Sequence, residues 1–370
     1  MSNDSAESYR RVDEAGAARK QLLTQLEQTL RKHWRLGQNM VLCWAPDPSG
    51  LLTVMVPHYF LGNLAANVRP DNEEPATEAF VREVISGSRL KSHSEIFTIA
   101  RRLGVSTSFI KLDSGLGEDA EILQAADAMI ASYGIGYVSS RAVLLFDIAE
   151  FSLYSPFEQT SQLNSLSYSM NSAYNKLQRQ GVDVNFARTT TGDGYYVWNR
   201  DLGPYPDLDL LSFLLLILID NAVARQQATG NTVPLIRSAF HIGSHYELFQ
   251  AEGVNPSKFS YIVGDVTIAL ARMLDSMQAG QVVLGDFEAA LPDLGGLHGP
   301  AAFLHSAIKE LTGLEKLRIA DKAMTELGLA SSQAGLGELA IVDKHGRALK
   351  AFNLALRVGL DGERFLLGHE

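Results

Sequence analysis

The chain has 370 residues, enough for roughly two domains of ordinary size, and carries a formal net charge of −10 at pH 7. This acidic balance argues against a nucleic-acid binder, because contacts to phosphate groups need a basic face. Cys43 is the single cysteine, so no intrachain disulfide can form, and we expect a cytoplasmic protein in a reducing compartment.

The part before residue 136 predicts a small α+β or mainly helical module. An amphipathic helix is expected over Asp13 to Arg35, with leucines every fourth residue on one face. Two apolar runs around a Pro-Asp-Pro-Ser-Gly turn predict a hairpin over Val41 to Val56. Further helices are expected near Ala76 to Ser86, Glu95 to Leu103 and Glu118 to Tyr133. We therefore assign residues 1–135 to an N-terminal regulatory or dimerisation module, which resembles the GAF class of sensors but carries no ligand-specific motif.

The most apolar run of the chain is Leu210 to Ile219. It is about half the length that a membrane span requires, and its residues follow helical spacing. Met1 to Arg19 is polar and charged, without the apolar stretch of a secretory signal. We therefore expect a buried core helix at this run and no membrane span.

An apolar run ends in an aspartate near the middle of the chain. Ala142 to Phe146 lack helical spacing, which is typical of a buried strand, and Asp147 follows them. A carboxylate in this place is costly unless a metal ion or a charged partner neutralises it. The segment that follows Ile148, Ala149-Glu150-Phe151-Ser152, predicts a turn whose backbone N–H groups bind phosphate oxygens.

A second aspartate lies in a predicted tight hairpin. Asp193 has a glycine on each side, and the strand-forming residues Tyr195 to Trp198 follow it. If the two strands are neighbours, Asp147 and Asp193 can together hold divalent cations over a triphosphate. Taken singly, each aspartate is better explained as a helix cap or a turn residue. Taken together, with the pattern around them, they favour nucleotide chemistry.

Several ordered blocks carry a family resemblance. They are Phe146–Ser152, Glu158–Gln159, Leu163–Leu166, Gly192–Tyr196, Ile236–Gly243, Gly264–Arg272 and Gly280–Leu284. Together they resemble the catalytic domain of class III nucleotidyl cyclases, the adenylate and guanylate cyclase superfamily. The resemblance extends from about Arg141 to Phe287. It implies an α+β fold over residues 136–370, with a ferredoxin-like βαββαβ core in which helices cover an antiparallel sheet.

The resemblance also implies a reaction, in which a nucleoside triphosphate becomes a 3′,5′-cyclic nucleotide plus pyrophosphate. In the family two Mg²⁺ or Mn²⁺ ions are held by two aspartates and a backbone carbonyl, which here are Asp147, Asp193 and Ile148. Arg272 matches the arginine that stabilises the transition state, and the alternative is a surface helix residue. Family active sites form between two catalytic domains, so one domain per chain implies a homodimer. The matching substrate-binding positions are Ala149, Glu150, Phe151, Ser152, Thr191 and Gly192.

Three positions depart from the family pattern. Purine-specific members carry a lysine or glutamate where this chain has Thr189, and an aspartate or cysteine where it has Tyr261. Without these groups a site cannot form the paired hydrogen bonds that select a purine. Ile268 replaces the asparagine that orients the ribose, and its side chain cannot form a hydrogen bond. The neighbouring Thr267 is the candidate substitute.

Two interpretations explain these departures. One is a pyrimidine cyclase that makes cyclic UMP or cyclic CMP, as in a branch found in bacterial anti-phage systems, with Arg188, Thr189 and Tyr261 reading the base. That branch implies a separate effector that binds the cyclic nucleotide. The other is a divergent adenylate cyclase that tolerates the losses. The competing class is a catalytically weak nucleotide-binding regulator on the same fold, which Ile268 favours.

The C-terminal part keeps both helix and strand character. His305 to Leu327 has helical spacing and predicts a helix. Apolar runs at Glu338–Val342 and Ala351–Leu356 flank a Lys-His-Gly turn and predict a hairpin. This resembles the terminal hairpin of the cyclase domain, where Lys344 would meet the triphosphate. The alternative is a solvated turn lysine.

Overall fold

The computed structural model describes residues 3–34, 39–66, 76–251, 258–314, 317–330, 336–342 and 346–369. The chain divides into two compact units. The first consists of Met1–Val138 and Tyr246–Ile262, and the second of Ser139–His245 and Val263–Glu370. The predicted boundary at residue 135 lies close to the end of Met1–Val138. The assignment of Tyr246–Ile262 to the first unit has no counterpart in the sequence-based division.

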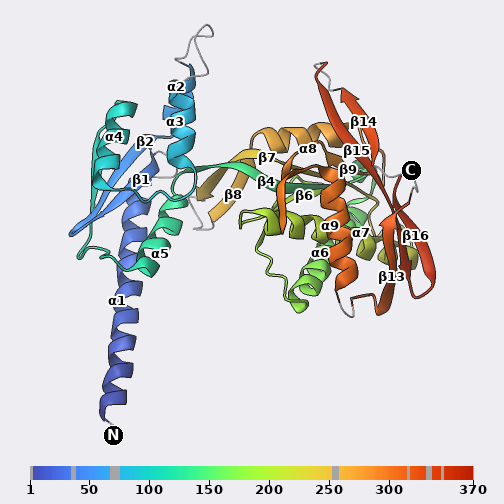
Figure 1. The fold of residues 1–370 in the computed structure, drawn as a ribbon, viewed down its shortest axis with the longest axis horizontal. Coiled ribbons are helices and arrows are strands. Elements are labelled where there is room, and N and C mark those ends of the chain that lie inside the picture. The colour runs from blue at the N-terminus through green and yellow to red at the C-terminus, as the bar shows by residue number, and fades with distance from the viewer. Residues whose placement is uncertain are drawn as a thin grey trace. The chain divides into compact units, whose positions relative to one another are not determined.

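The first unit contains a three-stranded antiparallel sheet with helices around it (Figure 1). The strands lie in the order β1 (Asn39–Asp47), β2 (Gly50–Pro57) and β3 (Thr107–Lys111). The helices are α1 (Asn3–Trp34), α2 (Phe60–Ala66), α3 (Ala76–Ile85), α4 (His93–Leu103) and α5 (Ala120–Ala131). The predicted hairpin and the four predicted helices are all present, with ends that differ by a few residues.

Side chains from β1 enter two separate cores of this unit. Trp44 shares one core with Leu26 of α1 and Ile130 of α5, and its Nε1–H donates to Asp127 at 2.7 Å. Cys43 lies in the other core, which α3 and α4 complete. Burial raises the pKa of the Cys43 thiol to about 12. The cysteine is therefore a packed core residue, since reactive thiols need an accessible, lowered-pKa setting.

The second unit is built on a larger sheet. Its central strands lie in the order β7-β4-β6-β5, with bounds Ile236–Ala251, Ile135–Ile148, Gly194–Asn199 and Phe186–Thr190. Helix α6 (Pro156–Arg179) follows β4, and α7 (Pro204–Gln227) follows β6. This is the βαββαβ order of a ferredoxin-like core. The predicted α+β class and its core topology are therefore confirmed.

Further strands extend this sheet beyond β7. They are β8 (Lys258–Val263), β9 (Val282–Gly285), β12 (Arg318–Ile319), β13 (Lys322–Leu329), β14 (Gly337–Val342), β15 (Ala348–Leu360) and β16 (Glu363–Gly368). β14 and β15 form the predicted C-terminal hairpin. Lys344, in its turn, lies outside the described residues. A separate small hairpin joins β10 (Ala289–Leu291) to β11 (Leu294–His298).

The helix predicted over His305 to Leu327 is wrong in its second half. Helix α9 spans Pro300–Gly313, and the chain then enters β12 and β13. β13 pairs with β15 from Met324 to Leu329. Hydrogen bonding to a neighbouring strand that comes later in the chain decides this segment, and tertiary contacts of this kind override local spacing.

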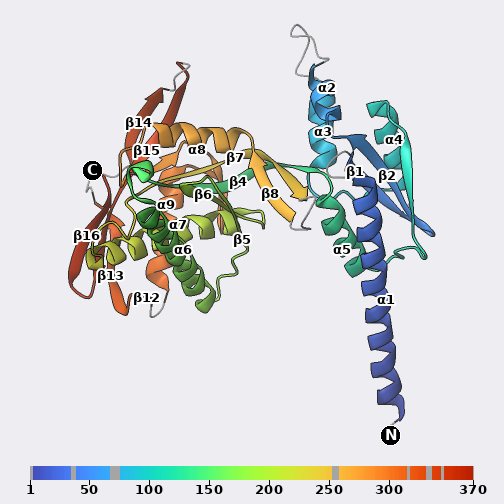
Figure 2. The same ribbon diagram turned by 180° about the vertical axis from the view of Figure 1, so that it is seen from behind.

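Helices cover the two faces of the large sheet unequally. Figures 1 and 2 show α6 and α7 on one face and α8 (Asp265–Asp275) on the other. Leu144, Phe146 and Ile148 of β4 enter the main core with α6, α7 and α9. Because side chains alternate along a strand, Asp147 points to the opposite face, where α8 lies.

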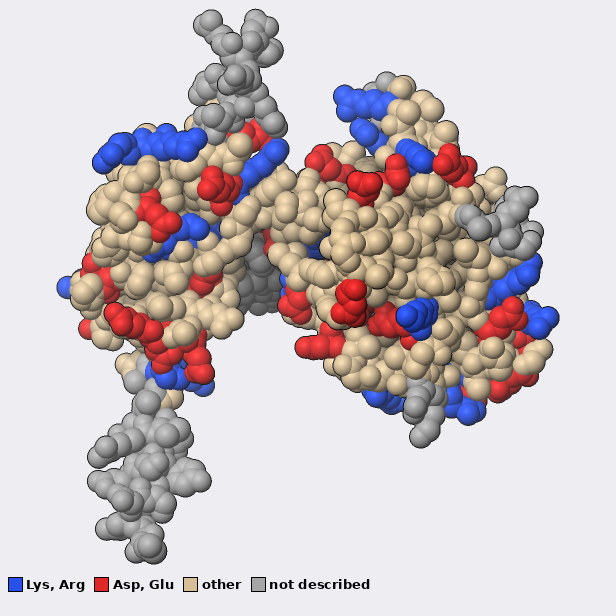
Figure 3. All heavy atoms as spheres, in the orientation of Figure 1, with Lys and Arg blue, Asp and Glu red and all other residues tan. Residues whose placement is uncertain are grey.

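The apolar run of α7 is a core element. Leu210 to Ile219 is buried throughout, as predicted. No helix among the described residues combines the length and hydropathy of a membrane span. On the face of the molecule drawn in Figure 3, acidic and basic side chains are interspersed over the described surface.

Asp209 on α7 makes a testable contribution to stability. Burial raises the pKa of Asp209 from 3.8 to about 7, and the negative charge of the nearby Glu310 on α9 adds to this rise. The folded state therefore disfavours the charged carboxylate, so this cost is fully present above pH 7 and is relieved as the pH falls. We expect Asp209→Asn to raise the Tm at pH 8 by about 3 °C or more, and by less at pH 5, in thermal unfolding.

Asp220 on the same helix is the matched control. Its carboxylate oxygens accept from Lys176 Nζ at 2.8 and 2.7 Å. Asp220→Asn removes an ion pair, so it should lower the Tm at both pH values. Stabilisation by Asp220→Asn, or destabilisation by Asp209→Asn, would contradict this account.

Candidate active site

Asp147 and Asp193 lie together at the ends of two neighbouring strands. Asp147 of β4 is paired with Gly194 of β6, and the Ile148 N–H donates to the Asp193 carbonyl oxygen at 3.0 Å. Asp147 is 5% exposed. Burial raises its pKa, the hydrogen bond from Arg237 opposes that rise, and the Asp193 carboxyl adds to it. Two carboxyl groups this close repel when both are ionised, so the pair favours a cation between them.

Arg237 supplies a cation that the sequence analysis did not assign to the site. Its Nε donates to Asp147 Oδ2 at 2.9 Å, and its Nη2 makes a second, shorter contact to the same oxygen. Arg237 lies on β7, next to β4 in the sheet. The charged side chain at the start of β7, between Ile236 and Ser238, was the available signal. Its partner was hidden because the two residues lie far apart in the sequence.

The hairpin that carries Asp193 depends on its glycines. Gly192 has a φ of 106°, in the region that favours glycine. Gly194 lies against β4 so closely that a Cβ atom would come within 1.8 Å of the Phe146 carbonyl oxygen. The Thr191 N–H donates to the Gly194 carbonyl at 3.0 Å and closes the turn. The sequence Gly-Asp-Gly thus places Asp193 at the tip, as predicted.

The predicted phosphate-binding turn follows β4 directly. The Ala149 N–H is already used, since it donates to the Leu235 carbonyl at 2.9 Å. Glu150 has a φ of 58°, and a 3-10 helix spans Phe151–Leu153. The first N–H groups of such a helix have no partner within it. Of the predicted turn, the amides at Phe151 and Ser152 are therefore better placed than that of Ala149 to receive an anion.

Helix α6 begins just after this turn. Ser155 caps it, accepting from the Glu158 N–H, while the Glu158 carboxylate accepts from the Ser155 N–H. Pro156 follows the cap at the first helical position. These local signals fix where the helix starts. They therefore also fix the length of the turn between β4 and α6.

The structure separates Arg188 from Thr189. Thr189 is paired with Tyr196, on the face of the sheet that carries Asp147. Arg188 points to the other face, where its Nη1 donates to Ser167 Oγ of α6 at 3.2 Å. Its guanidinium also lies 5.4 Å from the ring centroid of Tyr195. Neighbouring residues of one strand cannot face the same side, so Arg188 does not join Thr189 in this arrangement.

Helix α8 lies over the Asp147 face. The Tyr196 hydroxyl donates to the Thr267 carbonyl at 3.4 Å, which connects β6 to this helix. The Thr267 side chain is buried, and its hydroxyl is bonded to the backbone of Gly264. Ile268 is 48% exposed, and Arg272 lies in the last turn of the helix, partly buried. For Thr267 to orient a ribose, it would have to give up its helix-capping bonds.

Tyr261 belongs to the first unit. It lies on β8 and is 42% exposed. Its predicted role in base reading stays a prediction, as does that of Lys344, which the structure does not describe.

The carboxylate pair fits divalent cations by its chemistry. In the described part of the chain, no three His, Cys, Asp or Glu side chains form a metal-binding group. Two carboxylates and a backbone carbonyl are hard oxygen donors, and Mg²⁺ commonly takes few protein ligands together with water and phosphate oxygens. The guanidinium of Arg237 already neutralises Asp147 in the way a bound cation would. The residues present therefore suit Mg²⁺ or Mn²⁺.

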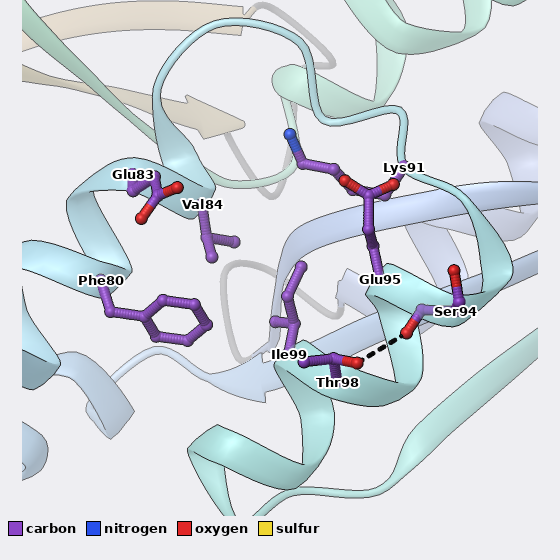
Figure 4. Close-up of a pocket in the computed structure, with 8 residues that line it drawn as sticks. All are labelled: Phe80, Glu83, Val84, Lys91, Ser94, Glu95, Thr98 and Ile99. Carbon is purple, nitrogen blue, oxygen red and sulfur yellow. Dashed lines mark hydrogen bonds between the residues drawn. The ribbon is translucent and has the colours of Figure 1, made fainter.

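The first unit has a cavity of its own. It has a volume of about 290 Å³ and lies between α3 and α4 (Figure 4). Phe80, Val84 and Ile99 form its apolar part, while Glu83, Lys91 and Glu95 lie around it. None of the predicted site residues lies in this cavity.

Comparison with known proteins finds solved cyclase structures that are similar to this chain. No family model and no curated protein matches it. The adenylyl cyclase CyaB from P. aeruginosa is 14% identical, covers 60% of this chain and 95% of its own, and has a TM-score of 0.37. The guanylate cyclase domain of RhGC from Catenaria anguillulae, solved in complex with GTP, is 15% identical, with 59% and 97% covered and a TM-score of 0.35. Identities and scores this low carry no argument about what the chain does.

Proposed function

We propose that this protein is a nucleotidyl cyclase, which converts a nucleoside triphosphate to a 3′,5′-cyclic nucleotide and pyrophosphate. The observation that carries the proposal is the adjacent pair Asp147 and Asp193 at the ends of paired strands, with a cation on the buried member. In the reaction the ribose 3′-oxygen forms a bond to the α-phosphorus. The bond between the α-phosphorus and the oxygen that bridges to the β-phosphate breaks, so pyrophosphate leaves. The proton of the 3′-hydroxyl passes to solvent.

Each part of the site has a role in this proposal. Asp147, Asp193 and the Ile148 carbonyl would hold two Mg²⁺ or Mn²⁺ ions, which would lower the pKa of the 3′-hydroxyl and neutralise the triphosphate. The N–H groups of Phe151 and Ser152 bind phosphate oxygens at the start of a helix. Arg272 stabilises the negative charge of the transition state.

Arg237 also has a role in this proposal, because it neutralises the Asp147 carboxylate. In the described structure it holds Asp147 in an ion pair. A divalent ion held by Asp147 would supply the same neutralisation, and Arg237 keeps the buried carboxylate paired without one, as burial requires.

The finer proposal concerns the base. Thr189 lies on the Asp147 face, and neither it nor Tyr261 is a purine-reading residue type. Both have hydroxyl groups, which can donate to or accept from the edge of a pyrimidine. We therefore propose UTP, or CTP, as the substrate. A divergent adenylate cyclase remains the alternative, and the pyrimidine product would serve as a second messenger, in anti-phage defence for example, read by a separate effector.

The experiment is to incubate the purified protein with Mn²⁺ and each of ATP, GTP, CTP and UTP separately. Products are resolved by mass and retention time. Cyclic UMP or cyclic CMP is expected, and cyclic AMP as the main product would overturn the pyrimidine assignment while keeping the cyclase. If none of the four nucleotides gives a product, the cyclase proposal itself fails and a nucleotide-binding regulator takes its place.

Ile268 offers a gain-of-function test. Because its side chain is 48% exposed, asparagine can replace it without a burial cost, and an amide can bond to the ribose where isoleucine cannot. Ile268→Asn should raise kcat about three- to tenfold, the worth of one hydrogen bond. Val263→Asn, at a residue that is 50% exposed, is the control and should leave kcat unchanged. An equal rise in the control, or a fall in Ile268→Asn, would count against a ribose-orienting position.

A further inference from the structure

The second unit has a groove on α6, away from Asp147 and Asp193. Its volume is about 550 Å³, and it is bounded by the second half of α6 and by the chain around β12. Helix α6 covers the sheet face opposite to the one that carries Asp147. A ligand in this groove therefore takes no part in the reaction at the aspartates.

The helix face that lines the groove is polar. Tyr168, Asn171, Asn175 and Arg179 recur at helical spacing and all line it. This face is exposed to solvent along its length, and its polar character is that of a surface helix. The chain around β12 bounds it and leaves a groove between the two segments. The groove therefore offers hydrogen-bonding groups to a polar occupant.

The charge of the groove is positive in a chain whose net charge is −10. Lys176, Arg179 and Arg318 line it, against the single carboxylate of Asp321. Lys176 is already held by Asp220 and Ser172. The Arg318 guanidinium donates to the Asp321 carbonyl oxygen, which holds it over the β12–β13 turn. Arg179 is exposed and has no partner among the described residues, so two guanidinium groups face an incoming anion.

The turn beside Arg318 is the two-residue turn of the β12–β13 hairpin. Ala320 and Asp321 have φ values of 46° and 64° and lie between the paired residues Ile319 and Lys322. Positive φ at both central residues is the type I′ geometry that such hairpins favour. In this groove the turn places the Arg318 side chain and the Asp321 carbonyl next to each other.

We propose that this groove binds a phosphorylated nucleoside as a regulatory ligand. Arg179 and Arg318 bind its phosphate, since guanidinium groups match phosphate oxygens in two-point contacts. Tyr168, which is 72% exposed, offers an aromatic face on which the base stacks. Asn171 and Asn175 supply the donors and acceptors for the edge of the base. The volume lies within the usual range for small-ligand sites.

The test must exclude metal-dependent binding of the ligand at Asp147 and Asp193. The full chain carrying Asp147→Asn and Asp193→Asn is titrated in EDTA with uridine 5′-monophosphate and, separately, with pyrophosphate, by isothermal calorimetry. We expect one uridine monophosphate per chain. Arg179→Gln with Arg318→Gln should weaken binding of both probes about tenfold or more, by loss of charged hydrogen bonds. Lys111→Ala, at an exposed cation of the first unit, should change neither.

Tyr168→Ala separates a nucleoside site from a simple anion site. It should weaken uridine monophosphate severalfold and leave pyrophosphate unchanged, because only the nucleotide stacks. Three results overturn the proposal: no binding of the nucleotide, binding that survives the double arginine variant, or a Tyr168→Ala variant that binds both probes as before. Circular dichroism of each variant confirms that a loss is not due to unfolding. Since the metal site is disabled throughout, failure here leaves the cyclase proposal standing.

Discussion

Asp147→Asn and Asp193→Asn should each lower the rate of cyclic nucleotide formation by about a thousandfold or more, the scale seen when the charge that stabilises a transition state is removed. Asparagine keeps the shape of each side chain and removes its charge. At Asp147 it also leaves Arg237 without its counter-charge. The measurement is product formation from the preferred nucleotide in Mn²⁺, together with Mn²⁺ binding by calorimetry, which should weaken in both variants.

Asp361→Asn is the matched control for this pair. Asp361 is an exposed turn residue with a φ of 45°, a conformation that asparagine also tolerates. It should leave the rate and the Tm unchanged. A metal-dependent rate within tenfold of the wild type in either Asp147→Asn or Asp193→Asn would remove the aspartate pair from the mechanism.

Arg272→Ala should lower the rate by about a hundred- to a thousandfold while Mn²⁺ binding stays intact, since the arginine acts on the transition state and not on the metals. In the proposed homodimer the metals come from one subunit and the arginine from its partner. An inactive Asp193→Asn chain and an inactive Arg272→Ala chain should therefore complement each other. In a heterodimer one of the two sites has all of its residues and the other lacks both.

The mixing experiment gives a numerical expectation. Random exchange makes half of the dimers heterodimers, each with one complete site, so activity should return to about a quarter of the wild-type rate per chain. Mixing each variant with the Asp193→Asn, Arg272→Ala double variant is the control. It should restore nothing, because no complete site can form. A mixture of the two single variants that stays inactive after subunit exchange would place the arginine and the aspartates in one chain.

The residues predicted to read the base lie on different faces of the sheet or in different units. Arg188 and Thr189 are neighbours within β5, and alternation along a strand sends their side chains to opposite faces. That separation was available from the sequence once the segment was recognised as a strand. The two residues were grouped because they are neighbours in the sequence, and the alternation of side chains along a strand was not taken into account. In the proposed site, Thr189 and Tyr261 are the residues predicted to read the base.

The contact of Arg237, in contrast, could not be predicted from the sequence. Its ion pair with Asp147 joins residues from two strands that are adjacent in the sheet but distant in the chain. No periodicity within β7 reveals such a partner. The same limit explains the error at His305 to Leu327, where the second half of the predicted helix pairs with β15 instead.

Short-range chemistry along the sequence determined several features by itself: the Gly-Asp-Gly hairpin, the Ser155–Glu158 cap of α6 and the buried run of α7. Each depends on turn geometry, capping or hydropathy within a few residues. Only the tertiary structure decided which groups meet: Arg237 at Asp147, and the polar face of α6 across from Arg318. Those contacts depend on the register and order of strands, which long-range hydrogen bonds and packing select together.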